Sequence, residues 1–99
     1  MAGYAGAWGT VYDCDSSSRL SGAYCYLRDN YGYWVSGYTN SSGYFYIARY
    51  FPGYSLTLRI SKSGYYTRYW YGNTSSYIVY YYCLNRRSGD GGGGGGGWT

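Results

Sequence analysis

A few aspartates and cysteines are the side chains of this sequence that could do chemistry, because it contains no histidine, glutamate or glutamine. The missing residue types supply much of general acid–base catalysis, so their absence argues against an enzyme. Asp13 and Asp15, together with Asp29, could offer oxygen ligands to a calcium ion. No glycine-centred ligand loop surrounds them, so the capping of turns is the favoured role. The sequence predicts no catalytic residue, no metal ion and no cofactor.

The three cysteines, Cys14, Cys25 and Cys83, form an odd set, so one internal disulfide at most leaves a thiol over. A cysteine nucleophile needs a base partner, and the chain has no histidine to serve. We therefore expect buried structural thiols. Cys25 should be buried and unreactive, while Cys14, near a strand end, is either accessible or paired with Cys83.

Tyrosine dominates the composition, with 19 tyrosines among 99 residues. The segments YFYI (44–47) and YIVYYY (77–82) place large rings on both faces of the same strands. One face can fill a core, and the other must meet a partner. The sequence therefore predicts a contact surface without identifying what is contacted.

The formal net charge is +4, and only 12% of the residues are charged. The arginines are dispersed along the chain, so no nucleic-acid footprint is predicted and the arginines are expected on solvated or interface surfaces. No apolar run approaches the roughly 18 residues of a membrane helix, and the first residues do not resemble a signal peptide. If Met1 is the true start, export by the general secretory route is not expected.

Turn-forming residues recur at short intervals and separate seven β-prone segments. Spacing of this kind is typical of an immunoglobulin-like sandwich. Asn40 and Asn73 also fit the N-glycosylation pattern, but turns are favoured. We predict an N-terminal arm (1–7), a sandwich domain (8–84) and a glycine-rich tail (85–99). The expected strands are 8–13, 23–28, 33–39, 44–49, 54–60, 65–71 and 76–84.

Alternation along these strands predicts which side chains face the core. In segment 54–60 the even positions are apolar, so Tyr54, Leu56, Leu58 and Ile60 should point inward and Thr57 outward. Segment 44–49 should turn its alternate apolar residues inward and Arg49 outward, unless a bulge reverses Arg49. The inward set is Phe45 and Ile47 from segment 44–49, and Val11, Ala23, Cys25, Leu27 and Val35 from the other segments.

Five short motifs occur in order along the chain: GTVYD (9–13), LSGAYCYL (20–27), TNSSGYF (39–45), PGYSL (52–56) and SGY (63–65). This order resembles the carboxypeptidase regulatory-like domain family over roughly residues 8 to 84. The resemblance implies a seven-stranded, transthyretin-like sandwich and a structural or binding role without catalysis. Cys25 departs from the family's usual valine and Asn40 from its common aspartate. In these turns Gly43 and Gly53 are expected at positive φ angles, which favour glycine.

The tail contains an unbroken glycine run, Gly91 to Gly97, followed by Trp98 and Thr99. Holding such a run costs on the order of 1–2 kcal/mol per residue in backbone entropy, so a partner must supply the compensation. We expect a neighbouring subunit to grip the tail, with Trp98 as the anchor and Arg86 and Arg87 positioning the other end. The alternative is a plain flexible tether.

These observations favour a non-enzymatic structural subunit of a large assembly, with copies of itself or other structural subunits as partners. A tailed-phage virion accessory protein, assembled in the host cytoplasm, is the first hypothesis. Alternatives are an extracellular filament subunit or an adhesive module that binds surface glycans; neither specific nucleic acid nor a membrane is expected as a partner. The predicted interface residues are Tyr66, Arg68, Trp70, Tyr77, Tyr81, Arg86, Arg87, Gly91, Gly94, Gly97 and Trp98.

Overall fold

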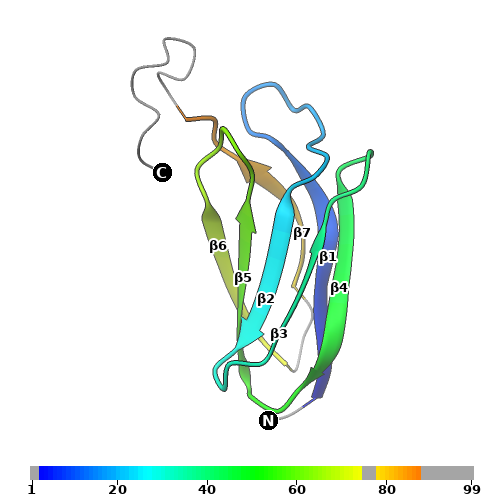
Figure 1. Ribbon diagram of the computed structural model, residues 1–99, viewed down its shortest axis with the longest axis vertical. Coiled ribbons are helices and arrows are strands. Elements are labelled where there is room, and N and C mark those ends of the chain that lie inside the picture. Colours follow the sequence, from blue (N-terminus) through cyan, green and yellow to red (C-terminus); the bar gives the residue numbers. More distant parts are fainter. Residues whose placement is uncertain (1–2, 75–77, 88–99) are drawn as a thin grey trace.

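The computed structural model describes residues 3–74 and 78–87, with the backbone alone for residues 79–81. This part of the chain is all-β and forms two sheets packed face to face (Figure 1). No helix in it is long and apolar enough to cross a membrane. The strands are β1 (Gly3–Asp13), β2 (Tyr24–Asp29), β3 (Trp34–Tyr38), β4 (Tyr44–Phe51), β5 (Ser55–Ser61), β6 (Arg68–Asn73) and β7 (Ile78–Leu84).

One sheet has the order β4-β1-β7 and the other the order β3-β2-β5-β6. Neighbouring strands are antiparallel except for β1 and β7, which run parallel. Seven strands in two sheets confirm the predicted sandwich, and each predicted segment overlaps one of them. Strand β1 runs along the long axis of the sandwich, so its two ends lie at opposite ends of the molecule (Figure 1).

The first strand begins at Gly3, five residues before the predicted start at Trp8. Residues 3–7, predicted to be an arm, instead pair with β4, beginning with Gly3 opposite Phe51. Glycine and alanine have low strand propensity, so the sequence of residues 3–7 did not predict a strand. Ala5 and Ala7 are buried, so pairing with β4 and burial decide the conformation here.

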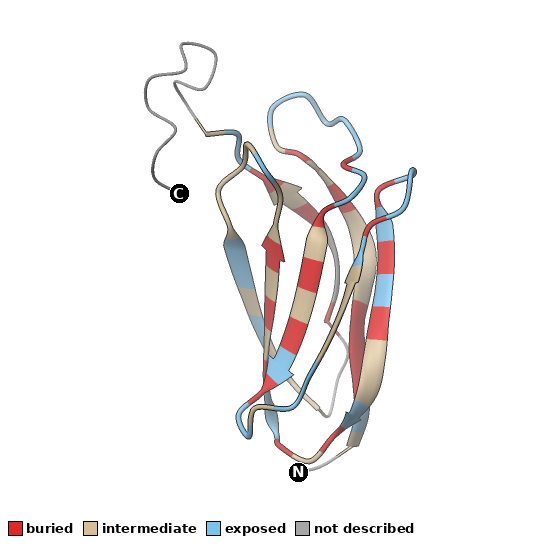
Figure 2. Cartoon of the chain, viewed as in Figure 1, coloured by how far each residue is buried: buried red, intermediate tan, exposed pale blue. Residues whose placement is uncertain are grey.

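The core lies between the sheets, and burial alternates along β2, β5 and the first half of β4 (Figure 2). Leu56, Leu58 and Ile60 are buried as predicted, whereas Tyr54 is 44% exposed, which corrects the prediction. The backbone N–H of Tyr54 donates to Asn30 Oδ1 at 2.9 Å, so Tyr54 belongs to the turn before β5 and escapes the strand's alternation. The other predicted core side chains, Val11, Ala23, Cys25, Leu27, Phe45 and Ile47, are buried, and Val35 packs partly buried against them.

Arg49 does not lean outward. It shares the inward phase of Ile47 and Phe51, and at the edge of the sandwich its guanidinium donates to the Trp34 carbonyl oxygen at 3.1 Å. Its Cζ atom lies 5.6 Å from the centroid of the Phe51 ring. A long side chain can cover apolar surface and still carry its charge to a polar partner, which explains this reversal without a bulge.

Two turn glycines have different reasons for being glycine. Gly43 has a φ of 78°, as predicted. Gly53 is not among the positive-φ residues, so that prediction is wrong. A Cβ atom at Gly53 would instead lie 2.8 Å from Asp29 Oδ2, the atom that accepts its backbone N–H. Close approach of a buried carboxylate, and not backbone conformation, requires glycine there.

Candidate interaction surfaces

The outer side of β1 and β4 is an aromatic surface, which we call the tyrosine face, and exposed Arg19 is bridged to Tyr12 at one end of it. Register places Trp8 opposite Tyr46 and Tyr4 opposite Tyr50, all in the outward phase of their strands. The Trp8 and Tyr46 rings are stacked, with centroids 5.0 Å apart. None of the outward side chains described on these two strands carries a charge. Its members are Tyr4, Trp8, Tyr12, Tyr44, Tyr46 and Tyr50.

The outer side of the four-stranded sheet is also aromatic but carries positive charge, and we call it the arginine face. Register aligns Tyr24 with Tyr38, Tyr26 with Arg59, and Arg28 with Trp34 in the outward phase. Its members are Tyr24, Tyr26, Arg28, Trp34, Tyr38, Thr57, Arg59, Tyr69 and Tyr71.

Rings on the arginine face pack against one another along the sheet. Tyr24 contacts Tyr38 at 5.2 Å and Tyr26 at 6.3 Å between centroids, and Tyr26 stacks on Trp34 at 5.6 Å. The guanidinium of Arg59 lies 4.6 Å from the Tyr26 centroid, a cation–π distance. Much of the ring-face area on this surface is therefore engaged within the chain.

A hollow of about 180 Å³ lies on the arginine face, lined by Tyr26, Arg28, Asp29, Thr57, Arg59 and Tyr69. The carboxylate of Asp29 is not available there, because its oxygens accept the backbone N–H groups of Tyr31, Tyr33 and Gly53. The oxygens of Asp29 are thus committed to backbone donors, and its charge offsets part of the positive charge that Arg28 and Arg59 bring to the hollow. Its volume is below the roughly 300–1,000 Å³ of small-molecule pockets.

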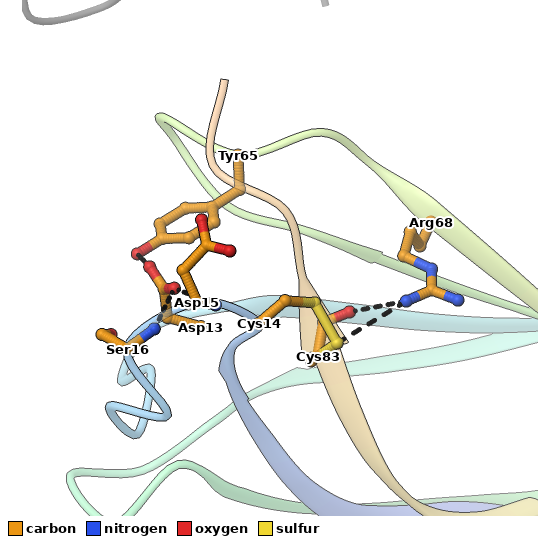
Figure 3. Close-up of a disulfide and its surroundings, with 7 residues drawn as sticks. All are labelled: Asp13, Cys14, Asp15, Ser16, Tyr65, Arg68 and Cys83. Atoms are coloured by element: carbon orange, nitrogen blue, oxygen red, sulfur yellow. Dashed lines mark hydrogen bonds between the residues drawn. A yellow bond between two sulfur atoms is a disulfide. The ribbon is translucent and has the colours of Figure 1, made fainter. Parts of the chain in front are cut away.

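The end of the sandwich from which residues 85–87 leave β7 is held by a disulfide and a polar cluster (Figure 3). Cys14 and Cys83 are bonded with their Cα atoms 4.8 Å apart, which selects the paired alternative for Cys14. Beside them, Asp13 is fully buried and accepts the Tyr65 hydroxyl at 2.7 Å and the Arg86 guanidinium at 2.7 Å. Cys25 is the buried thiol left over, as predicted.

The charge of Asp13 is stabilised by its surroundings. The backbone N–H of Ser16, the guanidinium of Arg86 and the hydroxyl of Tyr65 hold the pKa of Asp13 well below its usual range. Desolvation, aided by the neighbouring carboxylate, raises the pKa of Tyr65. This cluster is a structural clasp between β1 and the segment after β7, because each polar group in it has a partner.

The described structure does not bring Asp13, Asp15 and Asp29 together as a calcium site. Asp13 and Asp29 lie at opposite ends of the sandwich, since β1 and β2 run in opposite directions (Figure 1). Oδ1 of Asp13 accepts the N–H groups of Asp15 and Ser16, which is the turn-capping role predicted for it. Within the described residues no group of three or more potential ligands is close enough to hold a metal ion.

Four of the predicted interface residues are held within the sandwich or its clasp. Trp70 packs partly buried on the core and meets Tyr82 edge-on at 4.8 Å, so its expected outward position is corrected. It sits opposite the buried Leu58 in the inward phase of β6. The Arg68 guanidinium donates a hydrogen bond to the Cys83 carbonyl oxygen, and the backbone N–H of Tyr66 donates to the Asn85 carbonyl oxygen. Arg86 forms an ion pair with Asp13.

The other predicted interface residues are only partly described. The backbone N–H of Arg87 donates to the Gly64 oxygen, and Tyr81 lies in β7 opposite Thr10. Tyr77, Gly91, Gly94, Gly97 and Trp98 lie outside the described residues. The sequence reasoning did not name Arg28, Arg59 and Tyr26 as interface residues, although period-2 alternation on β2 and β5 placed them together on the outer face.

No protein-family model matches the chain, and no curated protein sequence is similar to it. The fold is similar to several solved structures. The shaft pilin SpaA of Lactobacillus rhamnosus GG has a TM-score of 0.62 and 10% identity, with 89% of this chain and 48% of the pilin aligned. GBS52, the minor pilin of Streptococcus agalactiae, has a TM-score of 0.54 and 16% identity over 87% of this chain and 45% of that one.

An enzyme shares the fold as well. The 3-chlorocatechol 1,2-dioxygenase of Rhodococcus opacus 1CP has a TM-score of 0.63 and 10% identity, covering 86% of this chain and 61% of the enzyme. This chain spans less than two thirds of each of these proteins. These structural similarities establish an immunoglobulin-like or transthyretin-like sandwich fold. Membership of the carboxypeptidase regulatory-like family rests on the sequence motifs alone.

Proposed function

We propose that this chain is a non-enzymatic structural domain of an extracellular surface filament, which associates with further copies of itself. The observation that carries the proposal is the exposure of large aromatic side chains on both broad outer surfaces of one small sandwich. Tyr4 is 60% exposed on the tyrosine face, and Tyr71 is 74% exposed on the arginine face. Apolar patches built from several rings commonly mark interaction sites in soluble proteins.

Two further observations favour a filament outside the cell over a virion assembled in the cytoplasm. Pilins are among the proteins that share the fold, and they support the filament alternative better than the virion hypothesis. The Cys14–Cys83 disulfide also fits an oxidising compartment, where such bonds persist. The likeness to pilins concerns the fold alone, so the proposed assembly rests on the exposed aromatic side chains of the two faces.

The chemistry of the described side chains favours structure over catalysis. Burial raises the pKa of the Cys25 thiol to about 12, so its nucleophilic thiolate is scarce at neutral pH. The carboxylates of Asp13 and Asp29 are occupied by hydrogen-bond donors. The likeness to the dioxygenase concerns architecture, and the described thiol and these two carboxylates are engaged in the fold.

The tail is proposed as a second means of contact. Seven consecutive glycines allow close backbone approach by a partner, and Trp98 could fill a pocket on the neighbouring subunit. The Asp13–Arg86 clasp anchors the first residues of the tail to the sandwich, ahead of the glycine run. Deletion of residues 89–99, and Trp98→Ala alone, should reduce assembly while the thermal unfolding midpoint stays unchanged.

Sedimentation velocity and electron microscopy of the purified, oxidised chain test the proposal. We expect the weight-average mass to rise with protein concentration and elongated particles to appear. Tyr31→Ser provides a matched control, since Tyr31 is 67% exposed but lies in the β2–β3 turn outside both faces. A chain that stays monomeric up to millimolar concentration, with or without its tail, would contradict the proposed function.

A further inference from the structure

We propose that the tyrosine face of one copy packs on the arginine face of the next, with an outward tyrosine of β4 entering the hollow between Arg28 and Arg59. This inference rests on the proposed function and adds its geometry: a head-to-tail contact between two different surfaces. Repeated from copy to copy, such a contact extends into an open chain when its rotation does not close a ring.

Charge complementarity is the first argument for this pairing. The described outward side chains of β1 and β4 are neutral, with Arg19 beside Tyr12 at the end of the face that lies away from Tyr50, and their aromatic rings carry negative π-faces. The arginine face presents Arg28 and Arg59 beside the hollow. A guanidinium over a tyrosine ring is attractive, and removal of water at an interface strengthens the attraction.

Shape is the second argument. The hollow of about 180 Å³ is too small for a typical ligand but is of the size of an aromatic side chain. Tyr46 and Tyr50 are 57% and 56% exposed and stand two positions apart on the same side of β4, with Ala48 between them. Tyr46 is held by its stack on Trp8, so a ring inserted by Tyr46 loses little freedom on binding.

Within one copy, Arg59 already stacks on one tyrosine ring. Its guanidinium lies over the Tyr26 ring at 4.6 Å, and Arg59 also lines the hollow. A planar guanidinium can stack on aromatic faces, so a tyrosine from the next copy would complete a ring–guanidinium–ring sandwich. The Arg59–Tyr26 contact within one copy is thus of the same kind as the arginine–tyrosine contact that we propose between copies.

Pairing of like faces is less favourable. Two arginine faces would bring four guanidinium groups together against two Asp29 carboxylates, so surfaces of the same net sign would meet. Two tyrosine faces would leave Arg28 and Arg59 outside the contact. The molecule measures 47 × 26 × 16 Å, so each broad face can supply the roughly 800 Å² per partner of a stable interface.

Saccharides are the competing occupant of the arginine face. A sugar would stack on open ring faces, but Tyr24, Tyr26, Trp34 and Tyr38 already pack against one another. Beside these rings the surface presents the guanidinium groups of Arg28 and Arg59. That composition resembles the aromatic and arginine-rich centre of a protein–protein interface.

A complementation experiment tests the pairing. Tyr46→Ser/Tyr50→Ser disables the tyrosine face and keeps the arginine face, whereas Arg28→Ser/Arg59→Ser does the reverse. Each double variant alone should associate at least about tenfold more weakly than the unmodified chain in sedimentation velocity. Mixed in equal amounts, the two variants should form a 1:1 heterodimer that grows no further, since each contributes one intact face.

Controls separate this inference from the proposed function. Circular dichroism must show that both variants fold, and Tyr31→Ser, which removes an exposed ring in the β2–β3 turn outside both faces, should assemble normally. If the unmodified chain assembles but the mixture stays monomeric, or if either variant alone still dimerises as tightly, the head-to-tail pairing is wrong and filament formation stands. If the arginine-face variant assembles normally but no longer binds heparin, the face is a saccharide site and the pairing is also overturned.

Discussion

The carboxylate of Asp13 and the guanidinium of Arg86 are joined by two hydrogen bonds, of 2.7 and 3.2 Å, across 73 positions of sequence. Asp13 is fully buried at the end of β1, while the Arg86 side chain is 58% exposed just after β7. The adjacent Cys14–Cys83 bond (Figure 3) and this ion pair together fix the point at which the C-terminal segment leaves the sandwich.

Asp13 should make stability depend on acidity. Its pKa is lowered in the folded chain, so its contribution is fully present above the unfolded value of about 3.9 and is lost as pH falls further. Asp13→Asn should lower the unfolding midpoint at pH 7, and the gap to the unmodified chain should narrow below about pH 4. Thermal scans from pH 7 to pH 2 measure this. Asp15→Asn, at an exposed position, is the control, and a gap independent of pH would contradict the role of the Asp13 charge.

The Cys14–Cys83 bond closes a loop across 69 positions, so its removal should cost roughly 2–5 kcal/mol of unfolding free energy. Chemical denaturation of Cys14→Ser/Cys83→Ser and of the reduced, unmodified chain should agree. Equal stability of the oxidised and reduced proteins would show that the bond is unimportant to the fold.

Cys25 should resist modification in the native state, because it is buried and its thiol pKa is raised to about 12. Mass spectrometry after alkylation should find no label on the native oxidised chain, one after denaturation, and three after denaturation with reduction. Rapid labelling of the native chain would place Cys25 outside the core.

Leu56→Ala removes a fully buried side chain and should cost roughly 2–5 kcal/mol, a large part of the stability of a small domain. Thr57→Ala, one position along on the outer side of β5, is the matched comparison and should cost less than about 1 kcal/mol. Similar losses in chemical denaturation would mean that the facing of β5 is wrong.

Gly6→Ala should weaken the pairing of β1 with β4. A Cβ atom at Gly6 would lie 2.7 Å from Ala48 Cβ, and neither strand can shift without losing its partner. We expect a destabilisation of roughly 1–3 kcal/mol. Gly3→Ala meets its nearest neighbour, the Thr74 oxygen, at an ordinary 3.5 Å and should be nearly neutral. Equal effects would show that the Gly6 contact relaxes easily.

The local sequence pattern was sufficient to predict much of the fold. The alternation of Leu56, Leu58 and Ile60, the turn residues between segments, and the odd cysteine count predicted an all-β sandwich with one thiol left over. These features could be inferred because a strand's period and a turn's conformation depend on neighbours in sequence. The positive φ of Gly43 followed for the same reason.

Contacts between distant residues decided the rest. The strand at residues 3–7 exists because β4 pairs with it, Trp70 turns inward because Leu58 and Tyr82 are its neighbours, and Asp13 is ionised in the core because Ser16, Tyr65 and Arg86 converge on it. Composition by itself identified an aromatic contact surface. Its division into a tyrosine face and an arginine face arises only when register sets Arg28 beside Trp34 and Arg59 beside Tyr26, because a one-residue slip would carry each side chain to the opposite side of its sheet.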